Sequence, residues 1–234
     1  MQHEDSVTQL FGEALYDVAQ QRGYAFQRFP LDGQDRSALA DQLLTNYHFF
    51  SLVEFKSGDR QLSTEAKKRA RVIELCKGLA SSPPMRALHD RCQFIAWRDS
   101  SSAKLRTDIY RHRICNQQVL GSDCGLRQLN IDGANEVSVD AFAQAFFATP
   151  PPAPTRAVSK ADFKTYVDWL LTTVSRGAAT SLELLARGRD SQGETIGVTL
   201  NSLQDLYDWL DGRLTPTPGA APSSTRAGRR HRPR

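Results

Sequence analysis

The chain has 234 residues, of which 40% are hydrophobic and 9% aromatic, ordinary values for a globular protein that can bury a core. No apolar run approaches the ~20 residues that a membrane-spanning helix needs. The N-terminus Met-Gln-His-Glu-Asp has neither the basic start nor the apolar core of a signal peptide. We therefore expect a cytoplasmic protein without membrane contact, whose four cysteines are reduced thiols rather than a disulfide framework.

The formal net charge is +4, but the positive charge is concentrated at one end of the chain. Five arginines lie within residues 226–234, beside His231, and removing these five from +4 leaves the rest of the chain near −1. This distribution excludes a uniformly basic nucleic-acid binder, so any nucleic-acid contact must be local. We expect residues 214–234 to be a disordered basic tail. It would serve either as a solubilising end or as a non-specific attraction to nucleic acid or an acidic partner.

Helix and strand signals alternate over the first part of the chain. In chain order, we expect a helix at Ser6–Arg22, strands at Tyr24–Leu31, Leu39–Thr45 and Phe49–Lys56, a helix from Ser63 or Thr64 to Leu79, a short helix at Met85–Asp90 and a strand at Cys92–Trp97. The short connection Asn46-Tyr47-His48 should make the second and third strands an antiparallel hairpin. This order indicates an α/β (α+β) fold with a mixed sheet flanked by helices.

A proline-rich segment divides the rest of the chain. Before it, we expect wholly or partly helical structure at Leu105–Leu120, a loop at Gly121–Gly133 and a helix at Val137–Ala148. Residues 149–158 include Pro150-Pro151-Pro152 and read as a stiff linker, hence a domain boundary. Residues 159–213 should form a small C-terminal α+β module, which we expect to serve recognition, dimerisation or assembly. Its expected elements are a helix at Phe163–Arg176 behind a capping box of Ser159 and Asp162, a hairpin of Leu182–Arg187 and Thr195–Leu200, and a helix at Ser202–Leu210.

The expected hairpin carries the candidate catalytic residues. Asp41 lies near the start of one strand, and the next strand ends in Glu54-Phe55-Lys56. Alternate residues of a strand share a face, so Glu54 and Lys56 should point the same way. Two carboxylates supply hard oxygen ligands for Mg²⁺, and the lysine can orient or activate a water molecule. The alternative is an edge hairpin whose charges face water and contribute little.

This arrangement resembles the PD-(D/E)XK nuclease superfamily, which has the restriction-endonuclease-like fold. The resemblance extends from the N-terminus to the strand that ends at Trp97, although Ala40 stands where the family often has Pro. The segment around Gly12-Glu13-Ala14 looks like the opening helix of resolvase-like members, which often carries an extra acid.

The resemblance implies that residues 1–148 form a nuclease domain that hydrolyses DNA phosphodiester bonds with Mg²⁺ or Mn²⁺. It assigns Asp41 and Glu54 as metal ligands, Lys56 as the catalytic lysine and Glu13 as a fourth acid. It also implies a bacterial or phage setting in antiviral defence, repair or mobile DNA. The alternative is a catalytically inactive protein of this fold, a nucleic-acid- or protein-binding subunit of a larger complex, with a protein partner or a second copy docked through the C-terminal module.

Basic residues near the motif are candidates for contact with a phosphate backbone. They are Arg60, Lys67, Lys68, Arg69 and Arg71 around the second helix, and Arg98, Lys104, Arg106, Arg111 and Arg113 further on. Tyr110 lies close enough to the second group to stack on a base. The alternative for the helix is an ordinary solvated face.

Two identically spaced pairs, His89-x-x-Cys92 and His112-x-x-Cys115, suggest a tetrahedral zinc site. Neither pair has the more diagnostic Cys-x-x-Cys form, and Cys92 begins an apparently buried strand. Ordinary core or surface histidines are the alternative, and we leave this open.

Overall fold

The computed structural model describes residues 2–31, 39–148, 153–174, 184–189 and 195–212. The predicted tail at 214–234 lies outside them. The helices and strands are α1 (Gln2–Arg22), β1 (Gln27–Pro30), β2 (Gln42–Thr45), β3 (Phe49–Lys56), η1 (Asp59–Lys68), α3 (Arg69–Ser81), α4 (Pro83–Cys92), β4 (Gln93–Arg98), β5 (Leu105–Ile109), α5 (Tyr110–Ile114), α6 (Gln117–Leu120), η2 (Gly121–Asp123), β6 (Val137–Ser138), α7 (Val139–Phe146), β7 (Val158–Ser159), α8 (Lys160–Val174), β8 (Leu184–Arg189), β9 (Thr195–Leu200) and α9 (Leu203–Leu210).

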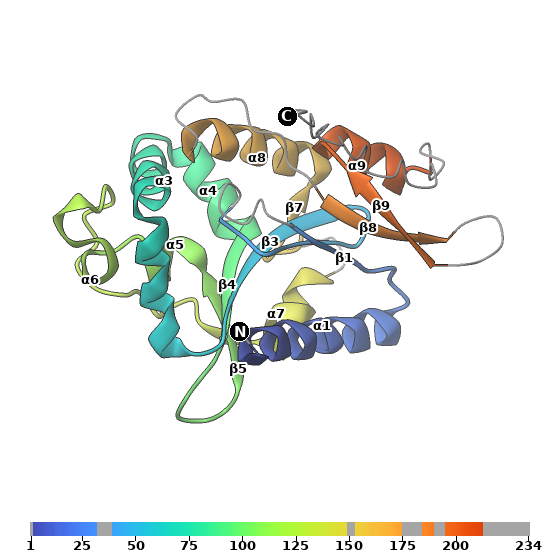
Figure 1. Cartoon of the computed structure of the whole chain (residues 1–234), viewed down its shortest axis with the longest axis horizontal. Coiled ribbons are helices and arrows are strands. Elements are labelled where there is room, and N and C mark those ends of the chain that lie inside the picture. Colours follow the sequence, from blue (N-terminus) through green and yellow to red (C-terminus); the bar gives the residue numbers. More distant parts are fainter. Residues whose placement is uncertain (1, 32–38, 149–152, 175–183, 190–194, 213–234) are drawn as a thin grey trace, which may run out of the picture.

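The centre of the described part is a seven-stranded mixed sheet in the order β1-β2-β3-β4-β5-β6, with β7 paired to β3 (Figure 1). Strands β1, β2 and β3 are antiparallel, and the predicted hairpin is confirmed. Its turn is closed by Asn46, whose Oδ1 accepts hydrogen bonds from the backbone N–H groups of His48 and Phe49. Helices α3 and α4 carry the chain back across the sheet, and β4 therefore pairs parallel to β3.

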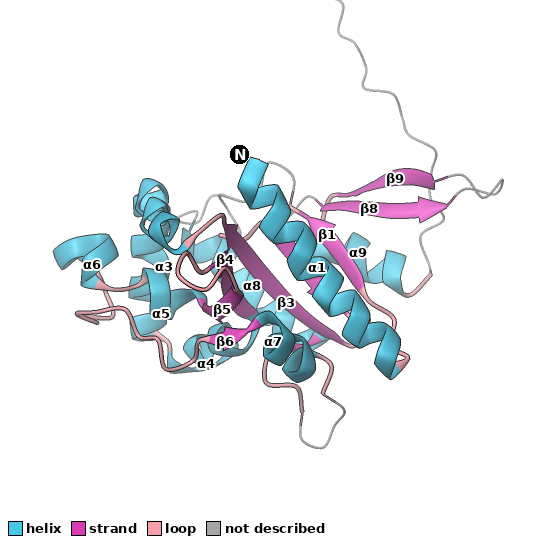
Figure 2. Ribbon diagram, turned by 90° about the horizontal axis from the view of Figure 1, so that it is seen from below, coloured by secondary structure: helices cyan, strands magenta, loops and turns pink. Residues whose placement is uncertain are grey.

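Helices cover both faces of the sheet, as the sequence predicts. Helices α1 and α7 pack on one face, in front of the sheet in Figure 2, whereas α3, α4, α8 and α9 share a core with the other face. On the α1 face, Phe11 contacts Phe55 and Phe142 with ring centroids 5.2 and 5.5 Å apart. The apolar stripe of α1 thus fixes that helix against β3, and the opposite face of the same strand is left for α3.

Several boundaries differ from the prediction. The first helix begins at Gln2 rather than Ser6, and a 3₁₀ segment, η1, precedes α3. The largest difference is at Leu105–Ile109, which is strand β5 rather than the start of a helix. This segment pairs antiparallel with β4 over five residues, and the gain from completing the sheet outweighs its local helical signals.

The segment after the proline-rich run belongs to the same core as the sheet. Val158 pairs with Phe50 of β3, and the ring of Phe50 contacts Phe163 and Tyr207 at centroid distances of 5.3 and 5.6 Å. The segment predicted as a C-terminal module therefore packs directly against β3. The predicted cap of α8 is confirmed, since Ser159 Oγ accepts from the Asp162 N–H at 3.2 Å.

The cysteines differ from the expectation of free thiols. Cys76 of α3 and Cys115, just after α5, form a disulfide, whereas Cys92 and Cys124 are free and buried. Within the described residues, the helices include none that is long and apolar enough to cross a membrane.

Candidate active site

Asp41 and Glu54 lie side by side on paired strands. The Asp41 N–H donates to the carbonyl of Val53 at 2.9 Å, one step beyond the pairing of Gln42 with Val53. Asp41 Oδ2 also accepts a hydrogen bond from the N–H of Phe55 at 2.6 Å. The β2–β3 register therefore places the Asp41 carboxylate next to that of Glu54, on the sheet face covered by η1 and α3.

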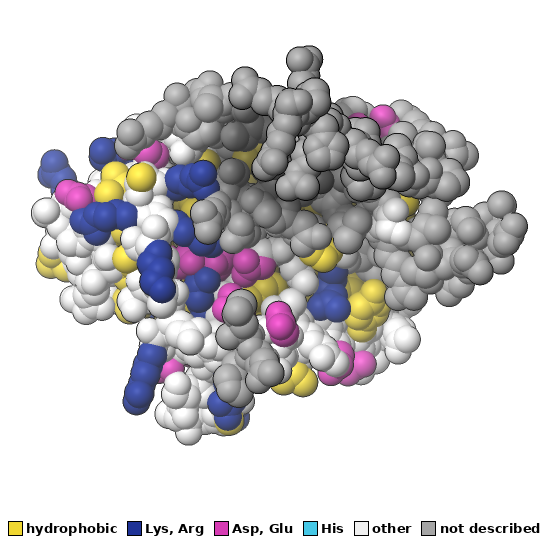
Figure 3. All heavy atoms as spheres, in the orientation of Figure 1, with side chains coloured by type: hydrophobic (Ala, Val, Ile, Leu, Met, Phe, Trp, Pro, Cys, Tyr) yellow, Lys and Arg dark blue, Asp and Glu magenta, His cyan; other side chains and the backbone are white. Residues whose placement is uncertain are grey.

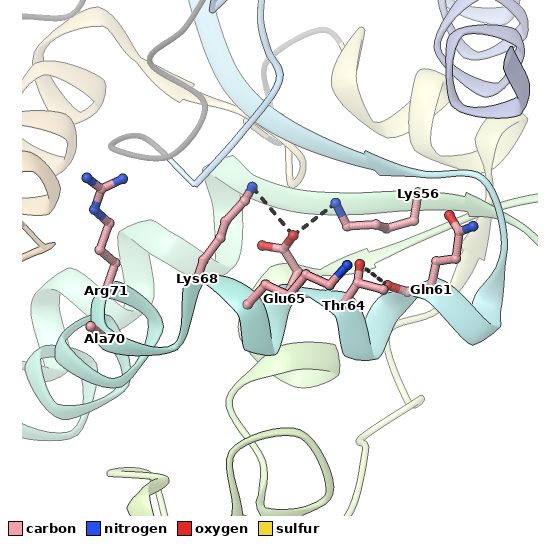
Figure 4. A pocket seen from close by; sticks show the side chains of 8 residues that line it. Lys56, Gln61, Thr64, Glu65, Lys68, Ala70 and Arg71 are labelled. Atoms are coloured by element: carbon pink, nitrogen blue, oxygen red, sulfur yellow. Dashed lines mark hydrogen bonds and ion pairs between the residues drawn. The ribbon is translucent and has the colours of Figure 1, made fainter. Parts of the chain in front are cut away.

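Glu54 belongs to a ring of alternating charges. Lys56 Nζ lies 2.5 Å from Glu54 Oε1 and 2.9 Å from Glu65 Oε1. Lys68 Nζ lies 2.8 Å from Glu54 Oε1 and 3.4 Å from Glu65 Oε1. We call these four residues the lysine–glutamate ring. Figure 4 shows three of the four residues: Lys56 of β3 and Lys68 of η1 both point to Glu65 of η1.

The two glutamates of the ring differ in how their second oxygens are satisfied. Both residues are 1% exposed. Glu65 Oε2 accepts a hydrogen bond from the Tyr110 hydroxyl at 2.7 Å. Glu54 Oε2, in contrast, is buried without a hydrogen-bond partner among the described residues. An unsatisfied buried oxygen is unfavourable, so Glu54 has an unused ligand position beside Asp41.

Burial is the main cause of the raised carboxylate pKa values at the site. Burial raises the pKa of Asp41 to about 6, against the effect of the Phe55 N–H. Burial, reinforced by Asp41 and Glu65, also raises the pKa of Glu54. For Glu65, burial works upward, but Lys56 and Lys68 outweigh it and lower the pKa. Burial acts to lower the pKa values of both lysines, but Glu54 and Glu65 raise them, so the lysines stay charged.

A basic cavity of about 680 Å³ opens beside the ring. The residues that line it come from β3, η1 and the start of α3: Lys56, Gln61, Thr64, Glu65, Lys67, Lys68, Ala70 and Arg71. Figure 3 shows Lys and Arg side chains around acidic ones on this side of the molecule. The cavity can therefore take an anionic group close to the carboxylates.

Several predicted residues are brought together, and others are not. Lys67 and Arg71 line the cavity, whereas Arg60 is exposed on η1 and outside the lining. Glu13 is exposed and accepts a hydrogen bond from Gln9 Nε2 at 2.9 Å, away from the other candidates. Helix α1 does bring an acid near the site, but it is Glu4, whose Oε1 lies 4.0 Å from Lys56 Nζ.

Three of the residues predicted around the second basic group are engaged within the protein. Tyr110 is fully buried, so its ring cannot stack on a base. Arg111 is engaged by Asp90, with Nε and Nη2 lying 2.5 and 2.6 Å from the two carboxylate oxygens. Arg113 is likewise paired with Asp108. These positions are corrections to the sequence prediction, because the sequence does not show which basic residues have acidic partners.

The structure does not bring the four residues of the suggested zinc site together within the described part of the chain. Cys115 is in the disulfide with Cys76. His89 is buried, with Nδ1 2.6 Å from the Tyr166 hydroxyl and Nε2 accepting from the Arg111 N–H. His112 Nδ1 lies 3.3 Å from Asn135 Nδ2. No group of three or more His, Cys, Asp and Glu side chains in the described part of the chain is arranged to hold a metal ion.

The sequence analysis missed Glu65 and the position of Lys68 within the ring. In a 3₁₀ helix, residues three apart share a face, and Glu65 follows the buried Leu62 by three. An acid in phase with an apolar residue was the signal for a buried carboxylate. An α-helical period also keeps residues three apart on one face, so the signal was present in the sequence and was not used.

The donor set fits Mg²⁺ better than zinc. Mg²⁺ is usually held by one or two carboxylates, with water and substrate phosphates completing its shell, so three protein ligands are not required. Asp41 and the unpartnered Glu54 Oε2 are such a pair. Asp41, Glu54 and Glu65 are three carboxylates against the two ammonium groups of the ring, so a cation would neutralise the excess charge.

Comparisons with known proteins find no match: no family model, curated protein or solved structure matches this chain. The functional argument therefore rests on the residues and geometry of the site.

Proposed function

We propose that this protein is a Mg²⁺-dependent nuclease of the PD-(D/E)XK type, acting on DNA. The observation that carries the proposal is the placement of Asp41 beside Glu54 on paired strands, with Lys56 on the same face and a basic cavity beside them. The element order α1-β1-β2-β3-η1-α3-α4-β4 supports it, because an acid directly before β2 and a Glu-x-Lys on β3 follow the order of that superfamily.

Asp41 and Glu54 would hold the ion. Mg²⁺, when bound, lowers the pKa of a coordinated water and offsets negative charge on the phosphate. The ammonium of Lys56, fixed against Glu54, can donate a hydrogen bond to the attacking water or to a phosphate oxygen. Lys67, Lys68 and Arg71 also line the cavity and would attract the phosphate backbone.

The alternative is an inactive protein of the same fold that acts as a nucleic-acid- or protein-binding subunit. One observation favours it: both lysines already lie within 2.8 Å of Glu54 Oε1, as in a closed structural ion cluster. In that case the ring would hold η1 on the sheet, and the cavity would bind phosphate without cutting it.

Nuclease assays on plasmid and single-stranded DNA with Mg²⁺ or Mn²⁺ separate these functions. We expect metal-dependent cutting that Glu54→Gln and Lys56→Ala reduce by roughly 10²-fold or more, because each removes a group that acts on the transition state. Glu13→Gln is the matched control, since Glu13 is exposed and outside the site. Circular dichroism checks that the variants fold. Cutting that survives both changes would remove the catalytic assignment of Glu54 and Lys56. Wild-type protein that binds DNA and never cuts it would leave the binding subunit as the function.

A further inference from the structure

Asp41 follows a strained turn. Leu39 is fully buried and has a φ of 50°, in the left-handed region that residues other than glycine rarely adopt. Such a conformation costs on the order of 1 kcal/mol or more and persists only where the surroundings fix it. The turn decides the direction in which Asp41 enters β2, so whatever fixes Leu39 also orients that carboxylate.

A buried side chain holds this turn. Gln93, the first residue of β4, donates from Nε2 to the carbonyl of Leu39 at 3.0 Å. Two residues later, the Asp41 carbonyl accepts from the Leu31 N–H at 3.0 Å and the Asp41 N–H donates to Val53. The strands thus fix the backbone of Asp41 itself, and Gln93 fixes the turn that precedes it.

Gln93 is in turn oriented by a buried hydrogen-bond chain with one direction. His89 Nε2 accepts from the backbone N–H of Arg111, so the ring proton of neutral His89 is on Nδ1 and faces the Tyr166 hydroxyl at 2.6 Å. That hydroxyl donates to Gln93 Oε1, which leaves the Gln93 amide nitrogen to donate to Leu39. Burial lowers the pKa of His89 to about 3 and keeps the ring neutral. In this hydrogen-bond chain, each link therefore determines which atom donates in the next.

We propose that Gln93, held by Tyr166 and His89, is a positioning residue that sets the Asp41 carboxylate for metal binding. The inference rests on the proposed nuclease function. Tyr166 belongs to α8, so the hydrogen-bond chain connects the C-terminal segment to the turn before Asp41. Gln93 and Tyr166 thus support Asp41 from the same face of the sheet, the face that α3 and α8 cover.

Metal binding tests this without relying on DNA cleavage. Titration of the full chain with Mn²⁺, followed by electron paramagnetic resonance, measures the affinity directly. Gln93→Met keeps the length of the side chain and removes its donor, and Tyr166→Phe keeps the ring and removes the hydroxyl. Loss of groups that orient metal ligands typically weakens affinity ~10–100-fold, and we expect both variants to bind Mn²⁺ about tenfold more weakly. The half-saturating Mg²⁺ concentration for cleavage should rise in parallel, while metal-free DNA affinity stays unchanged.

Ser51→Ala is the matched control. Ser51 Oγ donates to the Arg156 carbonyl at 2.5 Å, so this buried hydrogen bond also ties the C-terminal segment to β3, but it does not touch the turn at Leu39. We expect Ser51→Ala to bind Mn²⁺ like wild type. A loss of affinity equal to that of Tyr166→Phe would mean that loosening the segment is enough, and the positioning role would be wrong.

Two reference variants separate this inference from the proposed function. Asp41→Asn and Glu54→Gln should abolish Mn²⁺ binding at this site. If they do, and Gln93→Met and Tyr166→Phe bind like wild type, the positioning role alone fails. If Asp41→Asn and Glu54→Gln leave Mn²⁺ binding unchanged, the metal site and the role of Gln93 fail together. Tyr166→Phe is the smaller change and decides the question if Gln93→Met does not fold.

Discussion

Two buried ion clusters lie on the same row of the sheet and differ in how completely they are satisfied. The row runs from Glu54 through Ile95 to Asp108, as the strand registers show. Asp108 Oδ2 lies 2.7 Å from Arg113 Nε, and its Oδ1 accepts from the Ile109 N–H at 2.7 Å. Glu54 lies two strands away. Its Oε1 contacts the ammonium groups of both Lys56 and Lys68, whereas its Oε2 has no hydrogen-bond partner among the described residues.

We call Asp108, Arg113 and Glu136 the Asp108 cluster. Arg113 also pairs with Glu136, and its guanidinium lies 4.7 Å from the centre of the Trp97 ring. Arg106 Nε lies 3.6 Å from Glu136 Oε1, so two guanidinium groups face the two carboxylates, and both oxygens of Asp108 have partners. The lysine–glutamate ring, with Asp41 beside it, has more negative than positive groups and a spare oxygen next to a cavity. Unmatched features of this kind are typical of functional sites, where they oppose stability.

Removal of one cation from each cluster gives the largest expected contrast. Arg113→Met should leave Asp108 buried without its charge partner and lower the free energy of unfolding by about 3–5 kcal/mol. Lys68→Met should lower it by much less, because Lys56 still contacts both glutamates and the raised pKa of Glu54 allows it to take a proton. Urea unfolding at neutral pH in the presence of a chelator measures both. Equal losses would show that the two clusters are satisfied alike.

The disulfide gives a second way to compare the two clusters. It joins α3, the helix after η1, to the residue that follows α5, the helix that carries Arg113. A cross-link across 39 residues stabilises typically by ~2–4 kcal/mol. Reduction by a dithiol, or Cys76→Ser with Cys115→Ser, should lower the free energy of unfolding by this amount. Mn²⁺ affinity should be retained, because Asp41 and Glu54 are held by strands.

The double variant is its own control, since a dithiol should not change its unfolding. If Mn²⁺ affinity falls together with stability, the metal site depends on α3 as well as on the strands.

The sequence was sufficient for the centre of the fold and for the core of the candidate site. The aromatic and β-branched run from Phe49 to Lys56 predicted β3 to the residue, and strand alternation predicted that Glu54 and Lys56 share a face. These are local properties, and the short turn at Asn46 fixes the pairing. Glu13, in contrast, was chosen from a likeness of the first helix, whereas the entry angle of α1 brings Glu4 near Lys56.

The sequence was insufficient wherever the outcome depends on partners distant in the chain. The pairing of Arg111 with Asp90, the disulfide of Cys76 with Cys115 and the β7 contact with β3 all join segments that no local pattern relates. The segment Leu105–Ile109 is the clearest case, because it forms a strand by hydrogen-bonding to β4, and this pairing cannot be read from its own sequence.

The smallest expected effect concerns the charge of Asp41. Its pKa is raised to about 6 from an ordinary value of 3.8, so the folded protein binds a proton more tightly than the unfolded chain. Stability of the metal-free protein should therefore fall as pH rises from about 4 to 6, by on the order of 1–2 kcal/mol, and stay low above that range. Asp41→Asn has no proton to lose and keeps an oxygen for the Phe55 N–H. It should be more stable than wild type at pH 8 without metal.

Mg²⁺ should reverse this order. An ion that binds only the folded state stabilises it by about 2.7 kcal/mol at a hundredfold excess over its dissociation constant. Only wild type should gain this stabilisation, and more at pH 8 than at pH 5, because the Asp41 and Glu54 carboxylates must both be deprotonated and burial raises both pKa values. Urea unfolding of both proteins at pH 5 and 8, with and without Mg²⁺, measures the reversal, and Asp17→Asn on the exposed face of α1 controls for the loss of a surface charge. If wild type is the more stable protein at pH 8 without metal, Asp41 is a satisfied structural carboxylate like Asp108, and the contrast between the two clusters disappears.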